Sequence, residues 1–279
     1  MPLSVALPAS LVSDVPHLRE KTSHLGMVGR ALAIFRVNEV IIYRDRPAEN
    51  QRWDVELIST ILNYMETPQY LRKHLFPTMP LLQYAGVLPP LRTPHHPLTK
   101  RIVDLKDEEY RDGVIVKTDK ETLVDIGVER PIPLNERNIF VGQRITVKIF
   151  KDMHGLTIKK VEGPIVDKIY WGYRVNVTGS TLGQMLRMDL FDLVVLTSRY
   201  GKPLTEVIEE LRNRWKEDSK ILIAFGSPKQ GLKNILEHEG LKMKDVNALL
   251  TNTIPKQGTE TVRTEEALYA TLAVINIII

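Results

Sequence analysis

The sequence predicts an α/β fold in which a parallel sheet, with helices on both faces, is interrupted by a small β-barrel. Near the C-terminus, three consecutive units each contain an apolar strand, a loop rich in Gly, Ser and Thr, and a helix, as a parallel sheet with crossover helices requires. Between residues 98 and 165 the pattern changes to short, alternating, β-branched segments separated by turn residues, which is typical of an antiparallel barrel.

The composition limits the class of protein. With 279 residues, of which 43% are hydrophobic, the chain can bury one large core or two smaller ones. The longest apolar stretch is too short to span a bilayer, and the N-terminus lacks the basic head of a signal peptide, so we expect a cytoplasmic protein without membrane contact. The absence of Cys excludes disulfides and thiolate zinc sites. The net charge of +4 suits a polyanionic partner without identifying one.

The elements before residue 98 alternate between strand and helix. We expect strands at 5–7 and 39–43 and helices at 17–35 and 53–65. Strands then follow one another at 110–118, 122–128, 143–150 and 155–161, with turns at Asp119-Lys120 and His154-Gly155. The expected organisation is a discontinuous α/β domain, 1–97 and 166–279, with an OB-like barrel inserted at 98–165. The alternative for the insert is an open hairpin extension; the number of strands favours a closed barrel.

The three C-terminal units place their loops at the carboxyl ends of their strands, where open α/β sheets bind ligands. The strands are expected at 193–196, 221–225 and 246–250, and helices at 204–215, 232–239 and 267–279. The third loop is the richest in hydroxyls and amides, Pro255 and Gly258 interrupt regular structure in it, and Thr264 followed by two acids is typical of a helix start. The alternative is an ordinary exposed connection before a capped helix.

Two common nucleotide-binding motifs are excluded. The segment 226–233 lacks the Lys-Ser/Thr pair of a P-loop, because Gly231 is followed by Leu232 and Lys233. No G-x-G-x-x-G follows a strand, which argues against an ordinary dinucleotide-binding fold. The pattern therefore favours a site built from backbone amides and small polar groups on three loops.

Six segments together resemble the SPOUT superfamily of S-adenosylmethionine-dependent RNA methyltransferases, in the archaeal and eukaryotic branch with an OB-like insertion. The resemblance covers nearly the whole chain, and its segments are Val5-Ala-Leu-Pro-Ala-Ser10, Gly26-Met-Val-Gly-Arg-Ala-Leu-Ala-Ile-Phe35, Thr67-Pro-Gln-Tyr-Leu-Arg72, Pro94-His-His-Pro97, Gly226-Ser-Pro-Lys-Gln-Gly231 and Asn252-Thr-Ile-Pro-Lys-Gln-Gly258 with Val262-Arg-Thr-Glu-Glu266. It implies a C-terminal trefoil knot and a homodimer whose cleft is shared by two subunits.

The resemblance also implies that the three loops fold around S-adenosyl-L-methionine, with no metal. Backbone groups and apolar side chains suffice to hold its neutral adenosine, and Gly231 and Gly258 are expected to bring backbone close to the ligand. The expected cofactor-binding residues are Leu196, Thr197, Ser198, Gly226, Ser227, Pro228, Gly231, Asn252, Thr253, Ile254, Pro255, Gln257, Gly258, Thr261 and Val262.

The expected catalytic residues are Arg30, Arg263 and Glu266. The ribose-methylating branch has Asn-x-Gly-x-x-x-Arg where this chain has His24-Leu-Gly-Met-Val-Gly-Arg30, so Arg30 is expected to orient a phosphate or the acceptor, while ribose chemistry does not carry over. Arg263 could contact phosphate. Glu265 and Glu266 are candidates to accept a proton, with helix capping as the alternative. His95 and His96 lack the spacing of a helical zinc pair.

We expect an RNA methyltransferase that modifies a base of ribosomal RNA. The alternative is a non-catalytic RNA-binding or ribosome-assembly factor on the same scaffold, which the His24 departure leaves open. Cations near aromatic residues are candidate RNA contacts because they neutralise phosphate and stack on bases. They are Arg72, Lys73 and His74 beside Tyr70 and Phe76, and the barrel residues Lys148, Lys151, Lys159 and Lys160.

Overall fold

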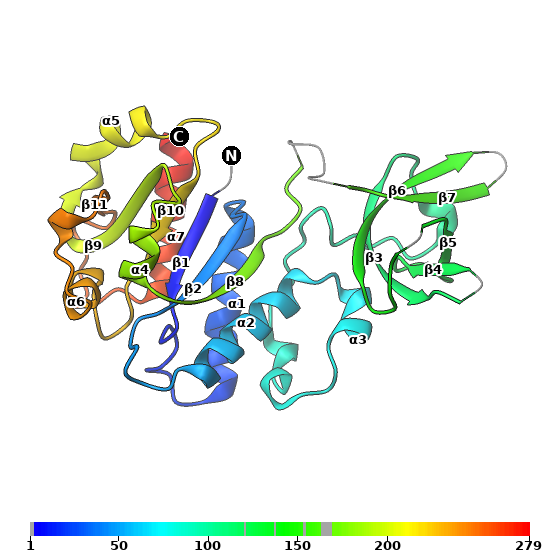
Figure 1. The fold of residues 1–279 in the computed structure, drawn as a ribbon, viewed down its shortest axis with the longest axis horizontal. Coiled ribbons are helices and arrows are strands. Elements are labelled where there is room, and N and C mark those ends of the chain that lie inside the picture. The colour runs from blue at the N-terminus through cyan, green and yellow to red at the C-terminus, as the bar shows by residue number, and fades with distance from the viewer. Residues whose placement is uncertain (1–2, 120, 137, 153–154, 163–168) are drawn as a thin grey trace. The chain divides into compact units, whose positions relative to one another are not determined.

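The computed structural model describes residues 3–119, 121–136, 138–152, 155–162 and 169–279 (Figure 1). The chain forms two compact units: Met1–Asn63, Leu81–Pro90 and Tyr173–Ile279 make the first, and Tyr64–Pro80 and Leu91–Gly172 make the second. The division falls at other residues than the expected boundary at 97/98. The expected boundary at 165/166 lies outside the described residues, as do Lys120 and His154 of two expected turns.

The first unit contains a six-stranded sheet, and every neighbouring pair in it is parallel, as predicted. The order is β11-β9-β10-β1-β2-β8, and the bounds are β1 (Leu3–Pro8), β2 (Glu39–Arg44), β8 (Arg174–Thr181), β9 (Leu193–Pro203), β10 (Ile221–Ala224) and β11 (Leu249–Asn252). The central strands β1 and β10 are apolar and almost wholly buried, which is typical of parallel sheets covered on both faces.

Helices flank this sheet. Their bounds are α1 (Leu18–Ile34), α2 (Arg52–Glu66), α4 (Leu182–Arg187), α5 (Leu204–Arg214), α6 (Leu232–His238) and α7 (Thr264–Ile278). On one face, α4 and α6 pack on side chains such as Ala6, Ile41 and Leu222. Because successive strand residues point to opposite faces, Val5, Val40 and their neighbours serve the other face, where α1 and α7 pack against each other (Figure 1).

The second unit is built on a five-stranded antiparallel sheet of order β5-β4-β3-β6-β7. The bounds are α3 (Arg72–Leu75), β3 (Tyr110–Lys117), β4 (Thr122–Asp125), β5 (Ile132–Leu134), β6 (Arg144–Asp152) and β7 (Gly155–Lys160). The edge strands β5 and β7 contact each other, so the sheet is nearly closed around a core that includes Ile115, Val124 and Val147. The structure thus confirms the prediction of an antiparallel, barrel-like sheet.

Strands β5 and β8 and helix α4 were not predicted individually, and each has a local explanation. Strand β5 contains Pro133, which argues against a strand, but Pro is tolerated there because β5 pairs only with β4 in the ladder. Strand β8 lies at the other sheet's edge, with most of its residues partly or fully exposed, so it lacks the apolar run of a buried parallel strand. Helix α4 follows directly, through a capping box between Thr181 and Gln184.

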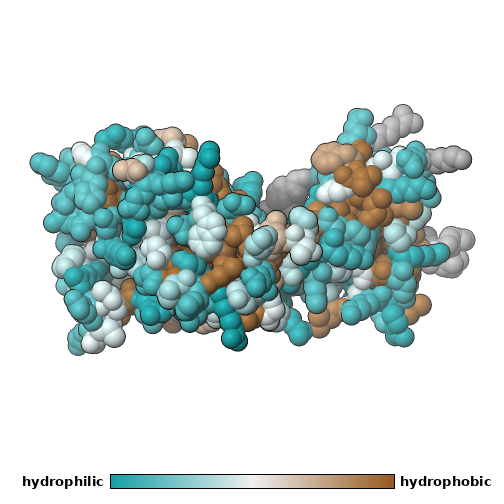
Figure 2. Space-filling view, turned by 90° about the horizontal axis from the view of Figure 1, so that it is seen from below, coloured by the Kyte–Doolittle hydropathy of each residue, from teal (hydrophilic) through white to brown (hydrophobic). Residues whose placement is uncertain are grey.

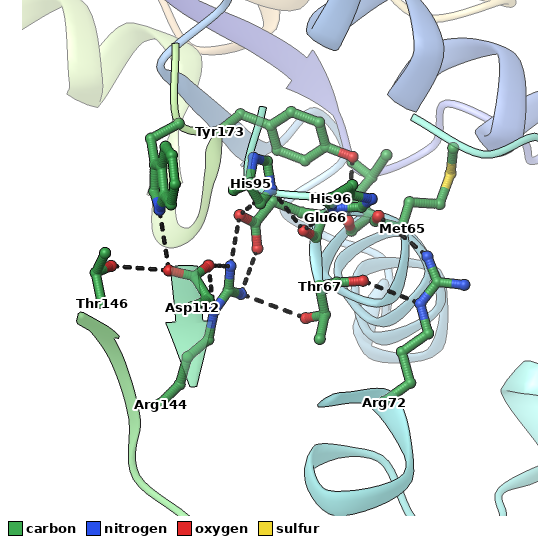
Figure 3. A network of polar contacts seen from close by, with 12 residues as sticks. Met65, Glu66, Thr67, Arg72, His95, His96, Asp112, Arg144, Thr146 and Tyr173 are labelled. Carbon is green, nitrogen blue, oxygen red and sulfur yellow. Dashed lines mark hydrogen bonds and ion pairs between the residues drawn. The ribbon is translucent and has the colours of Figure 1, made fainter. Parts of the chain in front are cut away.

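A buried polar network explains why residues 64–80 and 91–97 belong to the second unit (Figure 3). Arg144 pairs with Glu66, at 2.6 Å from Nη1 to Oε2, and also with the buried Asp112. His95, fully buried, lies with Nε2 3.2 Å from Glu66 Oε1. Burial raises the pKa of Glu66, but its hydrogen bonds to His95 and Arg144 outweigh burial and hold that pKa at about 2. The Pro-His-His-Pro segment is therefore structural in this unit.

Candidate functional site

A cavity of about 280 Å³ lies at the carboxyl ends of β10 and β11 and beside residues 197–200 of β9, where the sequence predicted a ligand site. The strand expected at 193–196 continues through these residues to Pro203. Side chains and backbone from all three loops line it. Twelve of the expected cofactor residues are among them: Thr197, Ser198, Gly226, Ser227, Pro228, Gly231, Asn252, Thr253, Ile254, Gln257, Thr261 and Val262. Among the described residues, the lining does not include Leu196, which is fully buried, or Pro255 and Gly258, which are exposed.

The loop after β10 is a tight turn with backbone facing the cavity. Ser227 N donates to Gln230 O at 2.9 Å, and Gln230 N donates back to Ser227 Oγ at 3.1 Å. A Cβ on Gly226 would lie 3.0 Å from Gln230 O, whereas a Cβ on Gly231 would meet no protein atom within 4 Å. A side chain at Gly226 would therefore crowd the turn, while Gly231 borders open space in the cavity.

The loop after β11 is held by hydrogen bonds of its own amide side chains. Asn252 Oδ1 accepts from Ile254 N at 2.9 Å, and Gln257 Nε2 donates to the carbonyls of Thr259 and Glu260. Thr264 Oγ1 donates to Gly226 O at 3.1 Å, which joins the start of α7 to the loop after β10. The hydroxyl-rich composition that marked this loop in the sequence therefore shapes its backbone.

Sequence reasoning missed ten residues that line the cavity: Arg199, Tyr200, Phe225, Lys229, Gln230, Lys233, Asn234, Glu260, Thr264 and Ala267. Most of them lie in the same loops as the predicted residues, so their position in these loops was the one feature of the sequence that could have identified them. Three are cations, and Glu260 is the sole carboxylate in the lining among the residues that the structure describes. The lining is thus mainly neutral, with a positive excess suited to a polyanion.

The expected catalytic residues lie outside the described lining of the cavity. Glu266 Oε2 accepts from Arg263 N at 2.9 Å, which is the geometry of a helix cap. Glu265 pairs with His24, with 2.9 Å between Oε1 and Nδ1. Arg30 Nη1 donates to Pro90 O at 3.0 Å, and the Arg263 side chain is exposed. These contacts give Glu266 a structural role and leave the catalytic roles as predictions.

The described part of the chain offers no cluster of three or more His, Cys, Asp or Glu side chains that could hold a metal ion. In the same residues, every helix is too short or too polar to cross a bilayer. Figure 2 shows a mainly hydrophilic face on which hydrophobic side chains form separate patches.

A parallel sheet with a ligand cavity at its carboxyl edge defines an α/β protein whose site is built for a compact, partly polar ligand. Over residues 2–275 the sequence matches the family described as "Putative RNA methyltransferase", and the chain belongs to that family. The chain is therefore an RNA methyltransferase.

Relatives among curated proteins extend this finding. The sequence is 35% identical to an uncharacterised protein of Halobacterium salinarum over 98% of both chains. It is 33% identical to the 28S rRNA (uridine-N(3))-methyltransferase of Drosophila melanogaster, over 98% of this chain and 61% of the relative. It is 28% identical to the protein of that name in Homo sapiens, over 98% of this chain and 77% of the relative.

Proposed function

We propose that this protein transfers a methyl group from S-adenosyl-L-methionine to a uridine base of ribosomal RNA. The observation on which the proposal rests is the cavity formed by residues 197–200 of β9 and by the loops after the adjacent parallel strands β10 and β11. The uridine-N(3) methyltransferases of fly and human, similar over nearly all of this chain, favour a base as the acceptor.

The residues of the cavity fit this cofactor. Its mainly neutral lining suits an adenosine held by backbone groups, and the space beside Gly231 is open to a ligand. Gln230 Oε1 is buried without a hydrogen-bond partner among the described residues, so it offers an acceptor for an amino group of the cofactor. When bound, S-adenosylmethionine supplies an electrophilic methyl group on its sulfonium; the protein must position the acceptor in line with that group.

We infer that Glu260 accepts the proton that leaves the acceptor nitrogen. Glu260 is the one acidic residue in the described cavity lining, and its backbone carbonyl is held by Arg199 Nη1 at 2.7 Å and by Gln257 Nε2 at 3.2 Å. Arg30 and Arg263 are proposed to contact RNA phosphates, since a guanidinium fork matches phosphate geometry. Glu266 is the second candidate for accepting this proton, after Glu260, because its carboxylate caps α7.

We further propose that the first unit has the SPOUT trefoil knot and that the second contains an OB-like barrel. The hydrogen bond from Thr264 to Gly226 supports the first proposal, since it joins the chain after the β11 loop to the β10 loop. We propose a homodimer as well. The exposed apolar residues Met27 and Ile34 on α1 and Ile277 on α7 support it. Leu272 and Ile275, which also lie on α7, are buried within the unit. Light scattering at micromolar concentration should give twice the chain mass.

Calorimetry and nucleoside mass mapping test the main proposal. S-adenosylmethionine and S-adenosylhomocysteine should both release or absorb heat on binding to the purified protein. Ribosomal RNA from cells that lack the gene should contain an unmodified uridine that the protein and S-adenosylmethionine convert in vitro to 3-methyluridine. Binding of neither ligand would overturn the cofactor assignment, and methylation at a ribose would overturn the base assignment.

A further inference from the structure

The segment Thr197 to Gly201 leaves the sheet beside the cavity. Leu250 and Thr251 are consecutive on β11, yet they pair with Leu196 and Lys202 on β9, so residues 197–201 bulge out of the ladder. A Cβ on Gly201 would lie 2.6–2.8 Å from the backbone of Thr251, so the returning chain fits only because that residue is Gly. The bulge presents Arg199 and Tyr200 to the cavity.

The Tyr200 ring is fixed although it is exposed. Arg199 Nη2 donates to Tyr200 Oη at 2.6 Å, and the guanidinium lies 4.8 Å from the centre of the ring. Arg199 is itself held at both ends, because Nη1 donates to Glu260 O at 2.7 Å and its backbone carbonyl accepts from Asn252 Nδ2 at 3.0 Å. The bulge, the β11 loop and the ring therefore form one hydrogen-bonded assembly.

Tyr200 is 71% exposed, and its hydroxyl is nevertheless held in position by Arg199. The guanidinium supports the ring, and the ring's exposed surface is turned to solvent at the cavity. An exposed aromatic ring of this kind stacks well with another flat π-system, and every nucleobase has such a ring system. Because the ring is ordered before binding, little conformational entropy is lost when a base stacks on it.

We propose that Tyr200, supported by Arg199, is a stacking platform for a nucleobase of the RNA substrate at the mouth of the cofactor cavity. This inference rests on the proposed function, since it needs RNA to approach the methyl donor there. The cations Lys229, in the neighbouring loop, and Lys233, in the first turn of α6, also line the cavity and suit the phosphates of the same strand. Arg199 is a positioning residue in this scheme, and Tyr200 touches the RNA.

Binding measurements on the full chain test the platform. The probes are a fluorescently labelled, uridine-containing single-stranded RNA of about ten nucleotides, within the usual site size of such binders, and, separately, S-adenosylhomocysteine. Tyr200→Ala should weaken RNA binding by about tenfold to a hundredfold with unchanged S-adenosylhomocysteine affinity. Tyr200→Trp should keep RNA binding within about threefold, because a larger ring still stacks. Phe140→Ala is the matched control, since Phe140 is 67% exposed in the other unit.

Each other outcome has a distinct meaning. Unchanged RNA affinity in Tyr200→Ala would overturn the platform, as would an equal loss in Phe140→Ala. A loss of S-adenosylhomocysteine affinity in Tyr200→Ala would overturn it too, and would assign the ring to the adenine of the cofactor. Failure of the wild-type protein to bind S-adenosylhomocysteine would count against the proposed function. This result comes from the wild-type protein alone and is therefore distinct from any effect of Tyr200→Ala. Arg199→Ala should weaken RNA binding less than Tyr200→Ala does, since the ring remains.

Discussion

Two glycines of the cavity loops have different surroundings although the sequence predicts the same role for both. Gly231 lines the cavity, and Gly258 does not. Added Cβ atoms meet no protein atom within 4 Å at either position, so neither substitution should disturb the fold. The two glycines are therefore a matched pair for locating the ligand.

We expect Gly231→Val to abolish S-adenosylhomocysteine binding, because its side chain would occupy the ligand's space, and Gly258→Val to bind normally. Calorimetry gives the affinities, and circular dichroism checks the folds. Equal behaviour of the two variants would show that the cofactor lies elsewhere.

Substitutions of the two carboxylates Glu260 and Glu266 should have different effects, one on the rate of methylation and the other on stability. Glu260→Gln should lower kcat by about a hundredfold, in line with the usual contribution of a general base, with cofactor affinity unchanged. Glu266→Gln should instead cost about 0.5–1 kcal/mol of stability by weakening the cap on α7, with kcat nearly unchanged. Single-turnover methylation and urea unfolding measure the two effects. A hundredfold loss of kcat in Glu266→Gln, with kcat nearly unchanged in Glu260→Gln, would make Glu266 the candidate base.

A partly buried imidazole predicts a pH dependence of stability. His96 Nε2 lies 2.7 Å from Glu66 O, and burial, with a smaller effect of His95, lowers the pKa of His96 to about 4 from its ordinary 6.5. Between these values the unfolded chain binds a proton that the folded chain excludes, so the free energy of unfolding falls as the pH falls from about 6.5 to 4, by roughly 3 kcal/mol. In His96→Gln, the free energy of unfolding should no longer fall by this amount between pH 6.5 and 4, as urea unfolding across that range would show. Curves of unfolding free energy against pH that run parallel for the two proteins would exclude His96 as the cause.

At the scale of elements, the β9–β11 pair decides whether the site forms. Gly201→Ala places a methyl group against the Thr251 backbone, so we expect a loss of about 1–3 kcal/mol in stability. Gly179→Ala, on the edge strand β8, is the control: nothing lies within 4 Å of its added Cβ, and stability should be unchanged or slightly higher. Denaturant unfolding measures both. Equal stability of the two variants would mean that β11 can move away without cost.

At the scale of the whole molecule, the segment 98–165 is tied by ion pairs to residues 64–80 of the same unit. Deleting residues 98–165 would remove Arg144 and Asp112 and leave Glu66 without its guanidinium partner. Removing one partner of a buried pair is strongly destabilising. The contribution of the barrel to RNA binding is therefore better tested by surface substitutions than by deletion.

The outer face of the barrel offers such a test. Lys148 and Lys159 are cross-strand partners, and their Nζ atoms lie 5.4 and 5.1 Å from the centre of the Phe150 ring. Replacing both by Gln should weaken binding of single-stranded RNA and reduce the slope of log K against log salt by roughly 0.7 for each phosphate that is no longer neutralised. Lys117→Gln, an exposed lysine of the same unit, is the control. An unchanged slope would remove the barrel lysines from the RNA site.

The sequence by itself determined the classes of element and the edge at which the site lies. Buried parallel strands such as β1 and β10 are nearly continuous apolar runs, and segments rich in hydroxyls and glycine follow the apolar stretches of β9, β10 and β11, so local composition was enough. Local composition could not reveal β5 or β8, because edge strands with Pro or alternating exposure lack that signal.

Only the tertiary structure decided which loop residues face the cavity and which groups the carboxylates meet. Tyr200 lines the site because β9 bulges against β11, and Glu266 caps a helix instead of facing the cavity. The unit boundary likewise depends on Glu66 meeting Arg144, 78 residues later in the chain. The direction of a side chain and the pairing of distant charges depend on packing between segments far apart in sequence, which no local pattern of residues specifies.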